Sequence, residues 1–189
     1  MVINSNLIKE KTKKEIENKI SLMGDYLRMN YLQRALKSKL DFDTEKYVLE
    51  KLSQIYESKN MFLEAARLIR TSAEINSTFK KKIKDYMKSV ELFIRGADYK
   101  ESDNVFLKAF EIGNSREKVI LKESLKKIYF AQAEFIIEKD RRMAAKKIYE
   151  KIYSLELDLF EKDFVKEKLL LLYDRLGDIK EYYNLQKED

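Results

Sequence analysis

The sequence contains no cysteine, no histidine and no proline, and only four of its 189 residues are glycine. Without cysteine, the chain forms neither disulfides nor a thiolate site. Without histidine, it lacks the side chain best suited to proton transfer at neutral pH and the commonest ligand of transition metals. Catalytic triads built on histidine are therefore excluded. We expect no enzymatic activity, no metal site and no cofactor.

Long apolar runs and glycine-rich loops are also missing. No segment approaches the roughly 20 apolar residues that a membrane-spanning helix needs. The stretch from Met1 to Ile8 is too short and too polar for a signal peptide. No glycine-rich loop is present that could cradle a phosphate. These absences predict a cytoplasmic protein with no membrane insertion and no nucleotide site.

The residues that are present favour helices. Because glycine and proline are scarce, nearly every strong signal for turns and strands is missing, while leucine, lysine, glutamate, isoleucine and alanine suit helices. Hydrophobic residues make up 44% of the chain and charged residues 38%, which is enough apolar material for a folded core. A chain of this length buries one sizeable core. We therefore predict a single all-α domain over residues 1–189.

A pattern of paired helices recurs along the chain. Its clearest copy surrounds the polar turn at Ser58–Asn60, with apolar, aromatic and small residues at helical spacing on both sides: Leu49, Leu52, Tyr56, Phe62, Ala65, Ile69 and Ser72. Similar turns follow near Gly24, Gly96, Lys139 and Gly177. The position that Ala65 holds recurs 36, 37, 43 and 37 residues apart, at Met29, Ala65, Ser102, Ala145 and Tyr182. Small residues here allow close helix packing.

This pattern resembles the tetratricopeptide repeat, and its long units are similar to the SNAP-like subclass of that superfamily. The resemblance implies a right-handed α-α superhelix of about five helical hairpins. The predicted units cover approximately residues 7–40, 44–75, 79–113, 116–154 and 161–187. Met29 and Tyr182 depart from the pattern because they replace the small residue. A plain helical bundle with ordinary capped turns is the other interpretation.

The resemblance also implies that the first helix of each hairpin lines a concave groove that binds a partner. The expected groove residues mix basic and aromatic groups: Lys14, Asn18, Lys51, Lys84, Met87, Lys88, Arg95, Lys127 and Phe130. Four of them fall where chaperone-binding members of the superfamily hold a partner's terminal carboxylate: Lys14, Asn18, Lys84 and Lys88. The fifth position of that clamp, usually asparagine, is Lys51 here. The alternative is that these lysines are simply solvated. The predicted function is that of a protein-binding adaptor or scaffold, with an acidic or C-terminal segment as its ligand.

Basic clusters suggest a second function. The formal net charge is +6, and residues 116–151 carry an excess of positive charge, whereas residues 152–189 carry an excess of negative charge. The candidate patch for RNA, the ribosome or an acidic partner consists of Lys80, Lys81, Lys82, Arg141, Arg142, Lys146 and Lys147. A phosphate backbone would suit these side chains, but no motif of a known RNA-binding module is present. RNA or ribosome association is therefore the alternative prediction.

The C-terminal region predicts self-association. The run from Leu169 to Tyr173 is hydrophobic around the whole helix, and only a short helix follows it. A stack of helices normally ends in a polar cap, which this region lacks. We therefore predict a homodimer contact that includes Leu171, Tyr182, Tyr183 and Leu185. The competing interpretation is that the last helix folds back over the apolar surface.

Overall fold

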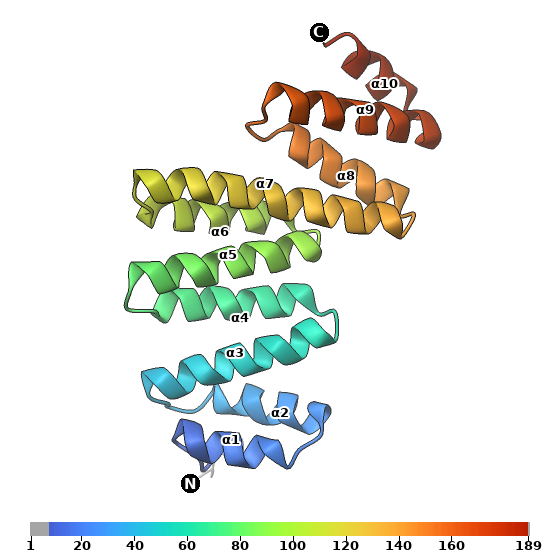
Figure 1. Ribbon diagram of the computed structural model, residues 1–189. Coiled ribbons are helices and arrows are strands. Elements are labelled where there is room, and N and C mark those ends of the chain that lie inside the picture. The colour runs from blue at the N-terminus through green and yellow to red at the C-terminus, as the bar shows by residue number, and fades with distance from the viewer. Residues whose placement is uncertain (1–7, 189) are drawn as a thin grey trace. The chain divides into compact units, whose positions relative to one another are not determined.

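The computed structural model describes residues 8–188, and over these residues it contains ten α-helices and no strand (Figure 1). The helices are α1 (Lys13–Ser21), α2 (Asp25–Ala35), α3 (Phe42–Ser58), α4 (Phe62–Ile75), α5 (Phe79–Arg95), α6 (Tyr99–Ile112), α7 (Ser115–Glu138), α8 (Arg142–Tyr153), α9 (Leu159–Leu176) and α10 (Ile179–Gln186). The prediction of an all-helical chain with about ten helices is confirmed for this part of the chain.

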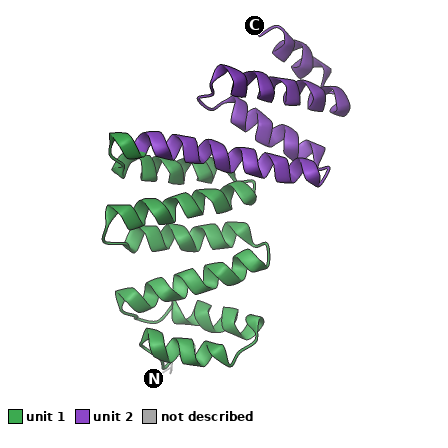
Figure 2. Ribbon diagram, in the orientation of Figure 1, with its two compact units in different colours: residues 1–117 green, residues 118–189 purple. Residues whose placement is uncertain are grey.

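The chain divides into two compact units, which Figure 2 shows in different colours. Unit 1 ends at Glu117, and unit 2 begins at Lys118 within the first turns of α7. In unit 1, each helix from α2 to α6 packs against its neighbour in the sequence and α1 contacts α3; in unit 2, α9 packs against α8 and α10. The prediction of a single domain over residues 1–189 stays a prediction, as does the superhelix.

Short polar side chains cap the starts of several helices. Asp41 accepts a hydrogen bond from the backbone N–H of Thr44, and Asp98 accepts one from that of Glu101. Thr12 and Asp158 each form a reciprocal pair with the glutamate three residues later. Such capping satisfies backbone donors that the first turn of a helix leaves without a partner. The positions of the helices are therefore largely encoded locally.

One turn geometry occurs four times. The turns that follow α3, α5, α7 and α9 each contain a residue with positive φ, at Asn60, Ala97, Asp140 and Gly177. In each turn the next residue donates its N–H to a carbonyl five residues earlier, as Asp98 does to Phe93 at 3.0 Å. This is the Schellman arrangement of a helix C-terminus. The four turns are 37, 43 and 37 residues apart, in step with the repeat seen in the sequence, so the fold is repeat-like.

The hairpin of α1 and α2 departs from this pattern. Gly24 precedes α2 with φ of −71°, outside the left-handed region. The N–H of Met23 bonds to the carbonyl of Ile20 instead. The first unit of the predicted repeat therefore has its own turn geometry.

Small residues bring the helices of unit 1 close together. Ala65, Ser72, Ser102 and Ala109 are completely buried, as expected if they occupy the helix contacts. The hydroxyl of buried Ser89 donates to the backbone carbonyl of Ala66 at 2.8 Å, so α5 approaches the backbone of α4 directly. Larger side chains, including Leu52, Val90 and Phe93, fill the space between.

Unit 2 has its own apolar core. Side chains from four helices form it: Leu121, Leu125, Tyr129, Ala133, Ile136, Ala145, Ile148, Tyr149, Ile152, Val165, Leu169, Leu172, Tyr173 and Leu185. The helices α8 and α9 pack together, and α10 packs on α9. Among the described residues, no helix is both long enough and apolar enough to cross a membrane.

Candidate functional site

The first helices of the hairpins in unit 1 form a shared surface, which we call the first-helix face and which consists of α1, α3 and α5. Contacts join α1 to α3, and ion pairs from Glu57 to Lys88 and Arg95 join α3 to α5. Helices that alternate in sequence are therefore neighbours in space within this unit. The face collects side chains that lie far apart in the sequence.

A pocket of about 330 Å³ opens between α1, α2 and α3. In one wall of the pocket, the Nε of Arg28 donates a hydrogen bond to the backbone carbonyl of Ile20 at 2.8 Å. The full lining is Glu17, Ile20, Ser21, Arg28, Tyr47, Lys51, Gln54, Ile55 and Ser58. Its apolar isoleucines and its charged rim suit a side chain that carries both apolar and polar groups.

Tyr47 lies at the centre of a small cationic cluster. The Lys13 and Lys51 ammonium groups are 5.1 and 5.7 Å from the centroid of its ring, distances at which a cation is attracted by the ring. Burial raises the pKa of the Tyr47 phenol, and the nearby Glu17 carboxylate raises it further. The phenol is therefore protonated at neutral pH, and two lysines face a single carboxylate around it.

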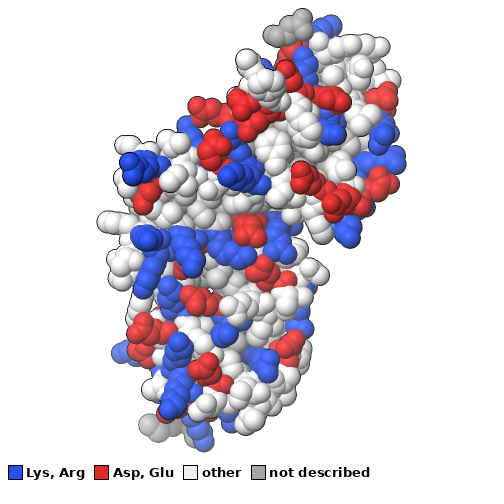
Figure 3. Space-filling model, viewed as in Figure 1, with Lys and Arg blue, Asp and Glu red and all other residues white. Residues whose placement is uncertain are grey.

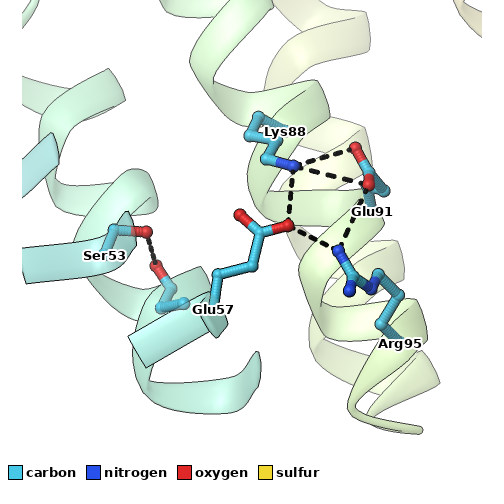
Figure 4. Close-up of polar contacts among 6 residues, drawn as sticks. Ser53, Glu57, Lys88, Glu91 and Arg95 are labelled. Carbon is cyan, nitrogen blue, oxygen red and sulfur yellow. Dashed lines mark hydrogen bonds and ion pairs between the residues drawn. The ribbon is translucent and has the colours of Figure 1, made fainter. Parts of the chain in front are cut away.

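A second cluster joins α3 to α5 at the other end of the face (Figure 4). Glu57, from α3, accepts hydrogen bonds from Lys88 at 3.3 Å and from Arg95 at 2.5 Å. Both cations also face Glu91 on α5. The Arg95 guanidinium lies 4.2 Å from the centroid of the Phe62 ring. These two basic residues are already neutralised by carboxylates of the same unit.

Three other lysines along α5 have no such partner. Lys80, Lys81 and Lys84 are exposed, and no ion pair joins them to a side chain in the described part of the chain. Lys81 and Lys84 share a side of α5 with Lys88, because residues three or four apart are neighbours on a helix. Figure 3 shows a row of basic side chains at the level of α5.

Two sets of ion pairs join α3 to α5, Lys46 with Asp85 and Glu57 with Lys88 and Arg95, so the two helices run side by side in the same direction. Lys51 lies on α3 between these two contacts, and Lys84 directly precedes Asp85 on α5. Lys13 and Lys51 flank Tyr47. We define these two lysines and the exposed Lys84 of α5 as the cationic band.

A buried polar network holds the same helices together from inside. Asp85 accepts hydrogen bonds from Ser72 at 2.9 Å and from Asn76 at 2.6 Å. Lys46 donates to the Asn76 amide oxygen at 2.6 Å and lies 3.8 Å from Asp85. Ser72 and Asn76 are buried, so this network satisfies polar groups that water does not reach. We assign it to stability.

The structure brings together only part of the predicted groove. Lys51 lines the pocket, Lys84 lies on the exposed side of α5, and Lys88 and Arg95 belong to the Glu57 cluster. Of the other predicted residues, Lys14 and Asn18 are exposed on α1 outside the pocket lining, Met87 is half-buried on α5, and Lys127 and Phe130 lie on α7 in unit 2.

Sequence reasoning missed Lys13, Glu17 and Glu57. The buried residues Ile16 and Ile20 identify the side of α1 that faces the core. They do not reveal which of the residues next to that side, such as Lys13 and Glu17, face α3. For Glu57 no local signal exists, because its partners on α5 are 31 and 38 residues away.

Much of the predicted basic patch in unit 2 is paired within the unit. Lys146 forms an ion pair with Asp178 at 2.9 Å, and Arg142 forms one with Asp140 at 3.0 Å. Hydrogen bonding to Asp178 raises the pKa of Lys146. Four of the seven predicted patch residues are exposed and form no ion pair with a described side chain: Lys80, Lys81, Arg141 and Lys147. Lys82 is half-buried.

The predicted self-association residues have different environments. Leu171 and Tyr183 expose 44% and 56% of their surface, whereas Leu185 is buried in the core of unit 2. Tyr182 is half-buried and packs edge-on against Tyr183, with ring centroids 5.6 Å apart. Leu185 is thus used within the chain, and Leu171 and Tyr183 remain accessible.

Comparison with protein-family models gives no match for this sequence, and comparison with curated proteins gives none either. We therefore infer function from the surface of the chain itself. Across the described residues, no group of three or more acidic side chains is arranged to hold a metal ion.

Proposed function

We propose that this protein is a non-enzymatic adaptor that binds an acidic segment of a partner protein across the first-helix face of unit 1. The observation that carries the proposal is the cationic band. Lys13 and Lys51 flank Tyr47 at 5.1 and 5.7 Å, and Lys84 lies exposed on the neighbouring helix α5. These cations exceed the nearby carboxylate of Glu17, so the band attracts anionic side chains.

The dimensions of the face suit a short segment. Packed helices lie about 8–10 Å apart, so three of them span roughly 20–25 Å. An extended segment of about six to eight residues covers that distance. The pocket at one end, with Ile20 and Ile55 in its wall, would take an apolar side chain of the same segment. The expected ligand therefore combines carboxylates with at least one apolar anchor.

The sequence resemblance to tetratricopeptide repeats supports the same interpretation, because members of that superfamily bind partner segments along their first helices. The proposed set differs from the one inferred by resemblance alone. Lys13 takes the place of Lys14, and Lys88 is engaged by Glu57 and Glu91. A clamp for a terminal carboxylate would therefore rely on Lys13, Lys51 and Lys84.

A titration with charge-matched peptides tests the proposal. The probe is a fluorescent 12-residue peptide of glutamate and leucine, and its counterpart carries lysine in place of glutamate. We expect preferential binding of the acidic peptide and a loss of at least tenfold in affinity for the double variant Lys51→Glu, Lys84→Glu. Lys147→Glu, which reverses an exposed charge in unit 2, is the matched control and should bind normally. Equal binding of both peptides would reject the proposal.

A second pair of probes tests the terminal-carboxylate version. Two acidic peptides that differ only in a free or an amidated C-terminus are compared by isothermal titration. Tighter binding of the free acid places the terminal carboxylate on the band. Equal affinity means that side-chain carboxylates alone are recognised and that the clamp is absent.

RNA or ribosome association is the second candidate, favoured by the start of α5. Three consecutive lysines, Lys80 to Lys82, occupy its first turn beside Phe79, which exposes 68% of its surface, and the same turn contains no acidic residue. Exposed lysines next to an exposed aromatic ring suit phosphates and unstacked bases. Capture of partners with and without nuclease separates the two candidates: partners that persist after nuclease support the adaptor, and partners that disappear support RNA.

A further inference from the structure

One side of α9 exposes a line of apolar side chains to solvent. Phe160, Phe164 and Leu171 expose 88%, 44% and 44% of their surface. They lie within about 60° of one another around the helix axis. Between and beyond them on the same side are Glu167, Lys168 and Arg175. We call these six residues the α9 stripe.

The stripe is supported from behind by unit 2. The Phe164 ring lies 6.3 Å from the ring of Phe130 on α7, centroid to centroid, and the Lys168 ammonium lies 5.1 Å from the centroid of the Phe164 ring. Val165, Leu169 and Leu172, on the opposite side of α9, are buried. The stripe is therefore a fixed surface of a packed helix and available for a contact.

Its pattern is self-complementary. If a second α9 lies antiparallel across the first, with the two-fold axis between residues 167 and 168, Phe164 meets the partner's Leu171. Glu167 then faces the partner's Lys168, so opposite charges are paired twice. Phe160 faces the partner's Arg175, the same kind of contact that Phe62 makes with Arg95 inside unit 1. Two-fold symmetry requires this reciprocity.

We propose that the α9 stripe is a homodimer interface in which two copies of this chain pair their α9 helices antiparallel in this register. The inference is independent of the function proposed for unit 1. The three apolar side chains leave roughly 300 Å² accessible per copy. This area is below that of most stable complexes, so the dimer is weak and its population rises with protein concentration.

Sedimentation velocity of the full chain over a range of concentrations tests the association. We expect the average mass to rise from monomer toward dimer. Leu171→Glu should keep the protein monomeric, because it places a carboxylate against the partner's Phe164. Met143→Glu, an equally drastic change at a residue of α8 that is 54% exposed, should leave association unchanged. A mass that stays monomeric at every concentration, or a dimer that ignores Leu171→Glu, overturns the proposal.

Charge swaps test the register. Glu167→Lys and Lys168→Glu should each weaken the dimer about tenfold, because each places like charges opposite one another. The double variant Glu167→Lys, Lys168→Glu should restore dimerisation. A partner protein that binds the same stripe would not produce this restoration in the isolated chain. Failure of the double variant to recover rejects the antiparallel register.

Because the chain has no native cysteine, a single introduced cysteine reports direction. Under mild oxidation, Glu167→Cys should cross-link two copies near the symmetry axis. Arg175→Cys should not, since the two introduced sulfurs would be separated by roughly 20 Å along the helices. Parallel helices would place residue 175 beside its own copy, so a cross-link in Arg175→Cys contradicts the proposal.

Discussion

The two units contain similar residues and use their charges differently. In unit 1, the acidic residues Glu57 and Glu91 neutralise Lys88 and Arg95, while Lys81 and Lys84 remain exposed. In unit 2, the acidic C-terminal region supplies partners to the basic helices before it. Lys122 pairs with Glu156, Lys126 with Glu161 and Lys146 with Asp178. In unit 2 the paired charges hold helices together, whereas we propose that the exposed lysines of unit 1 attract a ligand.

Aromatic side chains have different surroundings in the two units. On the first-helix face of unit 1, Tyr47 is buried among cations, and Phe79 is exposed beside three lysines. In unit 2, Phe160 and Phe164 lie on the open side of α9, in line with Leu171. The surroundings of Tyr47 and Phe79 suit an acidic ligand, and the α9 stripe suits an apolar partner such as another copy of the chain.

The largest effect that we expect is a loss of stability when a buried charge of unit 1 is removed, compared with removal of a more exposed one. Asp85→Ala leaves Ser72, Asn76 and Lys46 without their shared acceptor, and should lower the free energy of unfolding by about 3 kcal/mol. Glu57→Ala removes a half-exposed acceptor and should cost about 1 kcal/mol. Urea denaturation followed by circular dichroism measures both. Equal costs would show that the two networks contribute alike.

The next effect concerns cohesion in unit 2. The Lys126 side chain is only 12% exposed and lies between Glu161 and Glu123, so Lys126→Met should lower the free energy of unfolding by about 1–2 kcal/mol. The matched variant Lys108→Met removes a more exposed pair with Glu74 in unit 1. Its cost should be the smaller of the two, and a larger cost would contradict the assignment of unit 2's charges to cohesion.

Alkaline pH tests the same cohesion without mutation. Hydrogen bonds to Glu161 and Asp178 raise the pKa values of Lys126 and Lys146 in the folded state. A raised lysine pKa stabilises the fold fully below the unfolded value, about 10.4, and this stabilisation is lost as pH rises through the folded pKa. Urea midpoints should therefore fall above pH about 10. In Lys146→Met the decline should be shallower, and an unchanged slope would contradict the pairing with Asp178.

A smaller, reciprocal pair of changes compares the repeated turn in the two units. Ala97 has φ of 58°, which is unfavourable for a residue with a side chain, and Gly177 has φ of 72°. Ala97→Gly should stabilise by about 0.5 kcal/mol, and Gly177→Ala should destabilise by about 1 kcal/mol. A Cβ at Gly177 meets no atom within 4 Å, so backbone strain alone is measured. Thermal unfolding of both variants checks the signs.

Lys108→Met should also have the smallest effect on the free energy of unfolding. Both Lys108 and Glu74 expose nearly half of their side chains, so water and salt already screen their attraction. The free energy of unfolding should change by less than about 0.5 kcal/mol. The measurement is repeated at high salt, where the difference from the unmodified protein should disappear.

The helices and their turns could be predicted from the sequence because their signals are local. Asp41, Asp98 and Gly177 mark helix ends within a few residues, and buried Ala65 and Ser102 mark the helix contacts. The surface could not be predicted to the same degree. Whether Lys88 is available depends on Glu57, 31 residues away, and a local pattern does not contain that information. The choice between Lys13 and Lys14 likewise depends on how α1 packs on α3.

Binding of acidic segments by unit 1 can be mapped by an NMR titration of the isotopically labelled chain with the acidic glutamate–leucine peptide. If the proposal is right, backbone signals of Tyr47, Lys51 and Lys84 shift together and saturate, while those of Arg141 and Lys147 do not move. Shifts confined to Arg141 and Lys147, or no saturable shift at Tyr47, would contradict it.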